Sequence, residues 1–197
     1  MEKRELIRQL MPLIDEIKEE KLRNGVVEVW VKAWEESEWE DIADCPFLVE
    51  VQECSLIQHT NYVASVAMAM ASFARDTWRI QVNTDLLLAG ALLHDVSKVL
   101  EWAPQEGKPA RRSAIAENLV HGSYGVHLAL NAGMPLPVAH LIGTHTPQVS
   151  RVPKVIEGIF LCYADYAAAD VFNLDKGLPL LLEAFTPSST IKHRKNS

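Results

Sequence analysis

The sequence of 197 residues is poor in the features that mark secreted, zinc-finger and membrane proteins. Its three cysteines, Cys45, Cys54 and Cys162, include no C-x-x-C pair, which argues against a disulfide framework and against a structural zinc knuckle. No apolar run approaches the ~20 residues of a membrane-spanning helix, and the segment MEKRELIRQL has no signal-peptide core. We therefore expect a cytoplasmic protein that does not associate with membranes.

Basic residues are also scarce. The chain has 19 lysines and arginines against 26 aspartates and glutamates, a formal net charge of −7. Residues 1–53 carry 7 basic and 15 acidic residues, and residues 54–197 carry 12 and 11, so the acidic excess belongs to the N-terminal quarter. Nucleic-acid-binding surfaces need clustered Lys and Arg to neutralise phosphates. The sequence therefore predicts that nucleic acid is not a partner.

Alternating strand patterns are absent, and helical periodicity runs through almost the whole chain. We therefore predict an all-α fold in which residues 102–112 form a polar loop. The apolar spacing predicts helices over residues 2–23, 26–39, 55–74, 84–100, 114–131, 135–145 and 153–172, with a last apolar segment at 179–185. Pro12 is expected to kink the first of these helices, and Asn24–Gly25 to end it.

The length suits a single domain with one core. We predict a helical bundle over residues 51–185, an N-terminal helical extension over residues 1–50 that packs on it, and a flexible tail at 186–197. Trp30, Trp34 and Trp39 belong to the extension. They are expected to pack in the core, although closing a pocket or forming a dimer face are alternatives.

Two ionisable residues directly follow an apolar helix. His94 and Asp95 come after the run DLLLAGALL, and charged side chains are rarely buried without a partner. His59 lies in line with apolar residues of its own predicted helix, and Asp165 does so within IFLCYADYAAAD. Each of them alone could be a hydrogen-bonded core residue or a cap. Together, imidazole nitrogens and carboxylate oxygens are the ligand set of borderline and hard divalent ions, so these four residues predict a metal site.

This order of residues resembles the HD superfamily of metal-dependent phosphohydrolases, whose signature is a His, a His-Asp doublet and a later Asp on separate helices. The matching positions are His59, His94, Asp95 and Asp165, and the flanking stretches AGALLHDVSK and CYADY are also similar to that family. The resemblance covers residues 52–172. It implies a single helical HD domain that binds divalent metal.

The stretch LVHGSYGVHLALNAGMPLPVAHLIGTHTP resembles the segment in which binuclear members of the family place two extra ligands. This resemblance assigns those ligands to His121 and His145. The segment YADY with the preceding THTP is similar to bacterial HD-type hydrolases of symmetric dinucleoside tetraphosphates. His145 ends a predicted helix whose apolar residues face the core, so its ring is expected to point inward. The implied cofactor is a pair of divalent ions drawn from Fe, Mn, Zn, Co, Ni and Mg.

The implied reaction is hydrolysis of a phosphate ester or anhydride bond, in a nucleotide or another small phosphorylated metabolite, by a metal-activated water. Asp95 is the expected bridging carboxylate, because its two oxygens can reach two ions. Lys98 lies three residues after Asp95 and four after His94, hence on the same helix face. It is expected to bind the substrate and to neutralise phosphate charge during catalysis. Arg111 and Arg112 are expected to bind a distal phosphate.

Two other functions fit the same ligands. An HD-type diiron oxygenase would use them to react with O₂, and metal identity and O₂ consumption would distinguish it from a hydrolase. A non-catalytic, ligand-sensing HD domain is a third possibility, although such sensors often lose ligands and this sequence keeps the whole set. Formation of a homodimer is a further possibility that the sequence leaves open.

Overall fold

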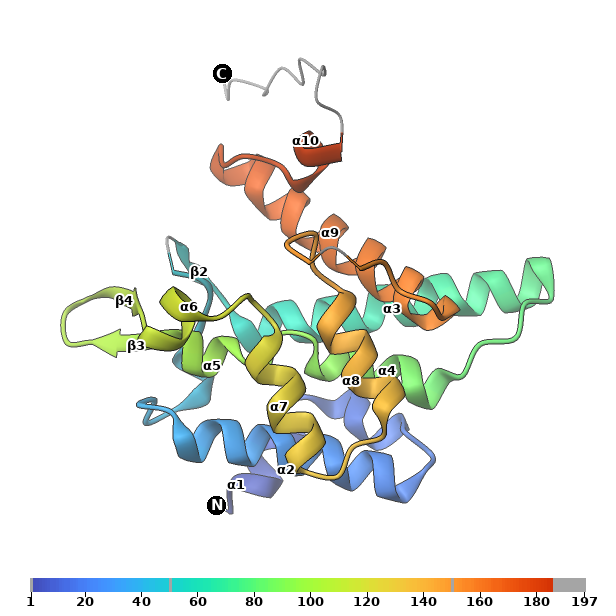
Figure 1. Ribbon diagram of the computed structural model, residues 1–197, viewed down its shortest axis with the longest axis horizontal. Helices are drawn as coiled ribbons and strands as arrows, with labels where there is room; N and C mark the ends of the chain where they lie inside the picture. The colour runs from blue at the N-terminus through green and yellow to red at the C-terminus, as the bar shows by residue number, and fades with distance from the viewer. Residues whose placement is uncertain (1, 50, 150, 186–197) are drawn as a thin grey trace.

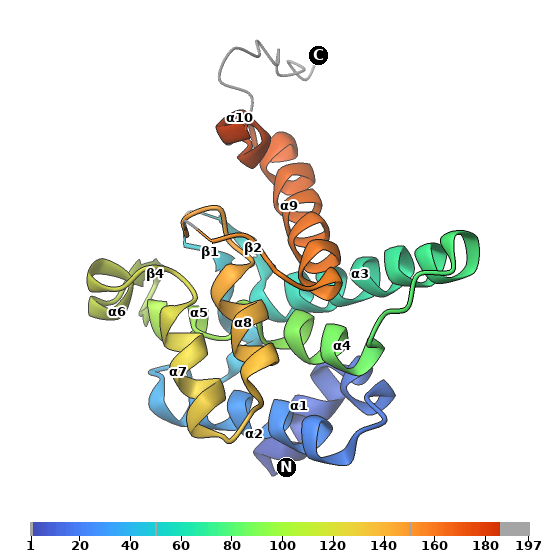
Figure 2. The same cartoon turned by 45° about the vertical axis from the view of Figure 1, so that its right-hand side comes forward.

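The computed structural model describes residues 2–49, 51–149 and 151–185 of the chain. Helices dominate these residues (Figures 1 and 2), so the all-α class predicted from the sequence is confirmed. The helices are α1 (Lys3–Leu10), α2 (Glu20–Glu36), α3 (Leu56–Trp78), α4 (Thr84–Leu93), α5 (Lys98–Glu101), α6 (Ala114–Asn118), α7 (Ser123–Asn131), α8 (Leu136–Thr144), α9 (Ile156–Lys176) and α10 (Leu181–Phe185). Two 3₁₀ turns, η1 (Pro12–Glu16) and η2 (Ile42–Asp44), lie before α3.

Two short antiparallel hairpins lie between the helices. β1 (Pro46–Leu48) pairs with β2 (Val51–Ser55), and β3 (Trp102–Gln105) pairs with β4 (Lys108–Arg112). The second hairpin replaces the polar loop predicted for residues 102–112, and Gly107 in its turn adopts a left-handed conformation (φ 64°). Strands of three to five residues are too short to display a strand period, which explains why the sequence pattern missed them.

The most buried of the longer helices is α4, which packs against α2, α3, α8 and α9, and the long helix α3 packs against both α4 and α9 (Figure 1). A capping box starts α3, because the Ser55 hydroxyl accepts the Gln58 amide N–H while the Gln58 side chain accepts the Ser55 N–H. α8 packs on α4 and α9 from another side, and α7 packs on α8. The helices that carry the predicted metal ligands therefore contact one another directly.

The N-terminal extension breaks at a different place from the one predicted. α1 ends at Leu10, just before Pro12, and α2 then runs without interruption through Asn24 and Gly25. The prediction that Asn24–Gly25 ends a helix is wrong. Gly25 instead allows close packing, since a Cβ atom there would lie 2.3 Å from the Met134 sulfur. The glycine thus serves close packing against a neighbouring segment rather than a turn.

Tryptophans connect the extension to the rest of the core. The Trp30 indole N–H donates to the Leu92 carbonyl at 2.8 Å, and the Trp39 indole donates to the Trp102 carbonyl at 3.0 Å. Trp30, Trp34 and Trp39 are all buried, which confirms the core-packing interpretation. Among the described residues, no helix is both long enough and apolar enough to cross a membrane.

Several predicted long helices are interrupted where a potential ligand lies. The helix predicted through residue 100 ends at Leu93, and α5 restarts at Lys98 after a turn that contains His94 and Asp95. The helix predicted over 114–131 is likewise split into α6 and α7, with His121 in the break. Gly122 makes this break possible because its φ of 82° is left-handed. The breaks place polar side chains at helix ends, facing one cavity.

Candidate metal centre and active site

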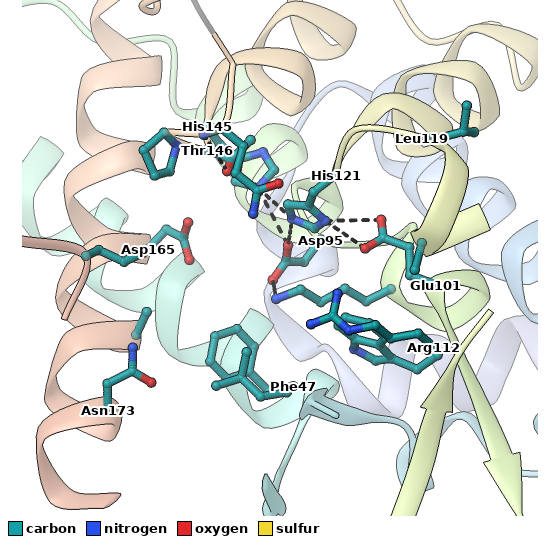
Figure 3. Close-up of a pocket in the computed structure, with 18 residues that line it drawn as sticks. Phe47, Asp95, Glu101, Arg112, Leu119, His121, His145, Thr146, Asp165 and Asn173 are labelled. Carbon is teal, nitrogen blue, oxygen red and sulfur yellow. Dashed lines mark hydrogen bonds and ion pairs between the residues drawn. The ribbon is translucent and has the colours of Figure 1, made fainter. Parts of the chain in front are cut away.

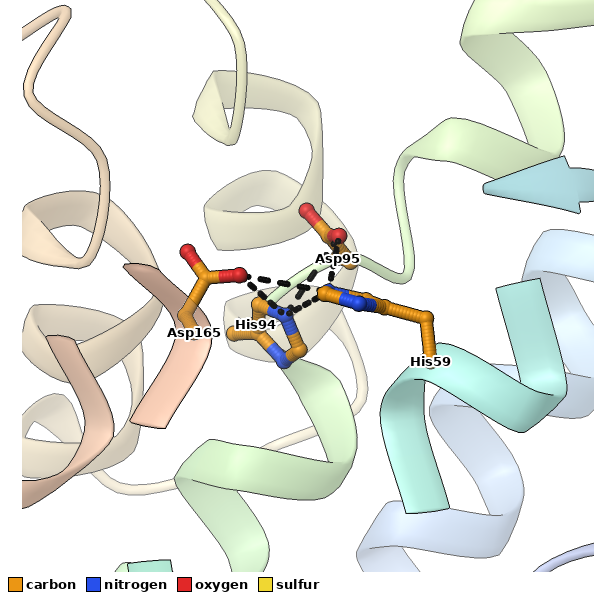
Figure 4. Close-up of side chains that lie close together, drawn as sticks. All are labelled: His59, His94, Asp95 and Asp165. Atoms are coloured by element: carbon orange, nitrogen blue, oxygen red, sulfur yellow. Dashed lines mark hydrogen bonds and ion pairs between the residues drawn. The ribbon is translucent and has the colours of Figure 1, made fainter. Parts of the chain in front are cut away.

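Four of the predicted ligands form a first cluster, which we call cluster 1 (Figure 4). His59 projects from α3, His94 and Asp95 from the turn after α4, and Asp165 from α9. The His59 Nε2 atom lies 3.3 Å from His94 Nε2, 3.3 Å from Asp95 Oδ2 and 3.2 Å from Asp165 Oδ1. The four residues are buried, with exposed fractions of 8% or less. Three helices thus direct two imidazoles and two carboxylates at one point.

A second cluster, which we call cluster 2, shares Asp95 with the first and adds His121 and His145. The Asp95 Oδ1 atom lies 2.8 Å from His121 Nε2 and 3.5 Å from His145 Nε2, and these two nitrogens are 3.3 Å apart. The expected inward orientation of His145 is confirmed, because its side chain is 1% exposed. Asp95 therefore directs one carboxylate oxygen to each cluster.

Hydrogen bonds at the far side of three imidazoles fix which nitrogen faces the clusters. His94 Nδ1 lies 2.7 Å from the Ala91 carbonyl, and His145 Nδ1 lies 2.7 Å from the Ile142 carbonyl. A carbonyl oxygen can only accept, so each Nδ1 carries the proton and each Nε2 of the neutral ring presents a lone pair. His121 Nδ1 is oriented in the same way by the Glu101 carboxylate, at 2.9 Å.

These orientations leave acceptors facing acceptors inside the protein. Nε2 lone pairs point at carboxylate oxygens, and the buried Asp95 Oδ2 atom accepts no hydrogen bond although Lys98 Nζ lies 2.8 Å away. Burial of such a set is unfavourable unless cations neutralise it. With metal–ligand bonds of ~2.0–2.1 Å, adjacent ligands of one tetrahedral or octahedral ion lie roughly 2.8–3.4 Å apart. Most of the ligand–ligand distances in both clusters lie near this range, so the residues fit divalent metal.

The same crowding shifts the pKa values of the ligands. Burial alone would lower the pKa of His94, but the charges of Asp95 and Asp165 outweigh it and raise that pKa to about 10. Asp95 and Glu101 overcome burial in the same way and raise the pKa of His121 to about 9. Burial favours the acid form of Asp95, yet Lys98 and His94 hold its pKa well below the ordinary value. Without metal, protons on imidazoles thus supply the positive charge that the carboxylates require.

Both clusters border a cavity of about 280 Å³ (Figure 3). Lys98 lines this cavity, and its Nζ atom lies 2.8 Å from Asp95 Oδ2 and 4.0 Å from the centre of the Phe47 ring. The cavity walls come from β1, the β3–β4 hairpin, α6, the segment after α8, and α9. Its other lining residues are Leu48, Glu101, Trp102, Arg112, Ala116, Leu119, His121, His145, Thr146, Pro147, Gln148, Asp165, Ala169, Asn173 and Leu181.

The two arginines expected at a distal phosphate have separate positions. Arg112 lines the cavity, and its guanidinium lies 5.2 Å from the centre of the Trp102 ring (Figure 3). Arg111 points elsewhere, with its guanidinium 3.4 Å from an exposed Glu38 carboxylate. Successive residues of a strand face opposite sides, so the hairpin can direct only one of them to the cavity. The geometry supports a substrate-binding role for Arg112 and does not support one for Arg111.

Two residues of the site were missed in the sequence. Glu101 is buried and accepts a hydrogen bond from the Ser97 hydroxyl at 2.7 Å in addition to its contact with His121. A signal existed, since Glu101 directly follows the apolar pair Val99–Leu100, just as Asp95 follows an apolar helix. Phe47 stacks on the His59 ring with a centroid distance of 3.7 Å. No sequence pattern predicts this contact, because it joins β1 to α3 through the fold.

The helical bundle and the order His, His-Asp, Asp define the class of protein. The HD domain profile matches residues 56–170, more than half of the chain, and the protein therefore belongs to the HD domain family. One similar characterised protein is the dihydroneopterin 2′,3′-cyclic phosphate phosphodiesterase of Methanocaldococcus jannaschii. The two are 28% identical over 174 residues, covering 83% of this chain and 69% of that protein. No solved structure gives a significant match.

Proposed function

We propose that this protein is a metal-dependent phosphohydrolase that acts on a small phosphorylated metabolite through a binuclear centre. The division of Asp95 between two clusters carries the proposal, with Oδ2 facing His59 and Oδ1 facing His121. Shared carboxylates of this kind hold two ions close together at hydrolytic centres. When bound, the two ions would supply Lewis acidity and lower the pKa of a water molecule.

The residues around the cavity have separate tasks in this proposal. Lys98, held between Asp95 and the Phe47 ring, faces the position of the reacting phosphate and neutralises its charge. Arg112 binds a more distant phosphate or another anionic group of the substrate, with its plane supported by Trp102. The apolar walls of the cavity, which include Leu119 and Leu181, exclude water from the organic part of the substrate.

The proposed substrate class is a phosphodiester, and cyclic phosphodiesters are the first members to test. Two observations support this class over a large polyphosphate. The similar archaeal protein is named for a cyclic phosphodiesterase activity, and the cavity of about 280 Å³ suits a single small metabolite. A symmetric dinucleoside tetraphosphate, suggested by the sequence resemblance, would extend well beyond this cavity.

A substrate panel with metal-loaded protein tests the proposal. Metal-free protein would be reconstituted with Mn²⁺, Fe²⁺ or Co²⁺ and assayed with phosphomonoesters, linear and 2′,3′-cyclic nucleotide diesters, and dinucleoside polyphosphates. We expect hydrolysis of diesters that an Asp95→Asn variant lacks. O₂ uptake, measured in parallel, would indicate a diiron oxygenase. Binding of the same compounds without turnover would indicate a sensor. Either of those results would overturn the hydrolase proposal.

A further inference from the structure

α9 distributes its charged residues in the reverse of the usual order, and most of α3 carries no charged residue. Between Ile156 and Phe172 of α9 the charged residues are Glu157, Asp165 and Asp170, and all three are buried. Residues 56–74 of α3 contain no Asp, Glu, Lys or Arg at all. A surface helix of a globular protein normally presents its charged residues to water. The solvent side of these two helices therefore lacks the residues that usually keep such a side in solution.

Large apolar side chains occupy that solvent side. Tyr163 of α9 is 66% exposed, and Phe73 and Trp78 of α3 are 62% and 65% exposed. We call this surface the α3–α9 outer face; it consists of Tyr62, Ala69, Phe73, Trp78, Ile159, Tyr163, Ala167, Val171 and Leu174.

The residues of the outer face belong to two helices, α3 and α9, that pack against each other. Tyr62 and Val171 line one shallow hollow, near the start of α3 and the end of α9. Phe73 and Phe160 line another, near the end of α3 and the start of α9. The two helices are thus antiparallel, and their exposed apolar residues form one strip with a hollow at each end.

The size of this strip corresponds to a protein interface. Its large residues have exposed fractions of 46–66%, which for side chains of ~150–250 Å² gives an apolar area of roughly 800 Å². Monomeric proteins rarely expose contiguous apolar patches above a few hundred Å². A stable interface of standard size covers about 800 Å² on each partner.

We propose that the α3–α9 outer face binds the same face of a second copy of this chain. A two-fold dimer brings one end of the strip against the opposite end of its copy. Charges beside the two ends are complementary in that arrangement. Glu53, Asp175 and Lys176 give −1 at the end with Tyr62, and Arg75, Asp76 and Arg79 give +1 at the end with Trp78.

Two other occupants suit the face less well. A membrane surface would favour a rim of lysines and arginines, whereas the charges beside the two ends of this face, −1 and +1, sum to zero. Residues 186–197 of the chain have the sequence TPSSTIKHRKNS, in which Ile191 is the one large aliphatic residue. Such a segment cannot cover an apolar area of this size. A second copy supplies matching apolar area of equal size.

Molecular mass in solution tests the dimer. Light scattering with size-exclusion chromatography should give twice 22.0 kDa for the metal-loaded wild-type chain at micromolar concentration. Tyr163→Glu and Phe73→Glu each place a charge within the proposed interface, so both variants should elute as monomers. Leu136→Glu is the matched control, because Leu136 is 72% exposed on α8, and it should remain a dimer. Circular dichroism establishes that all variants are folded.

Trp78 provides a second readout. It is 65% exposed in the single chain, whereas the other four tryptophans are at most 9% exposed. Acrylamide should therefore quench tryptophan fluorescence more strongly in Tyr163→Glu than in the wild type, and Trp78→Phe should remove this difference. A wild-type monomer, a dimer unaffected by both face variants, or binding of wild type to phosphatidylcholine or phosphatidylserine vesicles would overturn the proposal. None of these outcomes depends on hydrolase activity.

Discussion

The two clusters at Asp95 differ in how firmly the fold holds them. Cluster 1 has two carboxylates and two imidazoles on or directly after three packed helices, and its side chains are at most 11% exposed. Cluster 2 has one oxygen of Asp95 and two imidazoles, and one of these, His121, lies in a helix break with its side chain 14% exposed. More negative charge and more rigid ligands favour tighter cation binding. Cluster 1 is therefore expected to bind its ion more tightly, while cluster 2 lies on the more accessible side.

Substitution of the shared carboxylate of Asp95 should weaken metal binding at both clusters and so remove the difference in their affinities. Asp95→Asn keeps the shape of the side chain but removes the charge that both clusters use, so both ions should bind weakly. We expect activity to fall about 1,000-fold, because the electrostatic basis of catalysis is lost with the metal. Steady-state kinetics and metal analysis of the same preparation measure both effects. Activity within a few-fold of wild type would contradict a bridging role.

Lys98→Ala should separate substrate charge from metal binding. Lys98 forms an ion pair with Asp95 Oδ2, and an ammonium group offers no lone pair to a metal ion, so metal content should stay at the wild-type level. Turnover should fall about 100-fold if its ammonium group neutralises phosphate charge. Steady-state kinetics and metal analysis measure the two effects, and Lys98→Arg is the comparison variant that keeps the positive charge. A metal-poor Lys98→Ala protein would show that the lysine supports the ligands instead.

Glu101→Gln should affect cluster 2 alone. The carboxylate orients His121 through Nδ1, and loss of such a partner typically weakens metal affinity 10- to 100-fold. Calorimetric titration should show a weaker second binding event and an unchanged first one. His121→Ala is the positive control, since it should abolish the second event. Equal weakening of both events would mean that Glu101 stabilises the whole site rather than one ligand.

The stability of the metal-free protein should depend on pH in a characteristic direction. The pKa values of His94 (about 10) and His121 (about 9) are raised above the ordinary value of about 6.5. Their contribution to folding is complete below about pH 6.5 and is lost as pH rises through about 9 and 10. The melting temperature of metal-free protein should therefore fall between pH 6.5 and 10. Metal-loaded protein should lack this trend, and a rising melting temperature without metal would refute the assignment.

The sequence allowed the residues of cluster 1 to be predicted as neighbours because each one interrupts an apolar context. These polar residues have buried apolar neighbours, and the sequence alone shows this contrast; they are His59, His94, Asp95 and Asp165. The all-helical class could also be predicted from the sequence alone, because the apolar residues recur with the period of a helix. His121 and His145 required the family resemblance, because their surroundings alone indicate no ligand role.

Features that depend on contacts between distant segments could not be predicted in this way. Asn24–Gly25 has the composition of a helix stop, yet packing against Met134 decides its role. The β3–β4 hairpin directs Arg112 to the cavity and Arg111 away from it. The sequence predicted a polar loop here, and a loop without regular structure does not indicate which of the two arginines faces the cavity. Tertiary packing outweighs local propensity at these positions.

A crystal structure of the manganese-loaded protein, with anomalous scattering recorded, tests the central claim most directly. Two anomalous peaks should lie roughly 3.5–4 Å apart, one contacting Asp95 Oδ2 with His59, His94 and Asp165, the other contacting Asp95 Oδ1 with His121 and His145. Under limiting manganese, the peak at cluster 1 should be the stronger of the two. A single peak under saturating manganese, or two peaks that Asp95 does not bridge, would contradict the account.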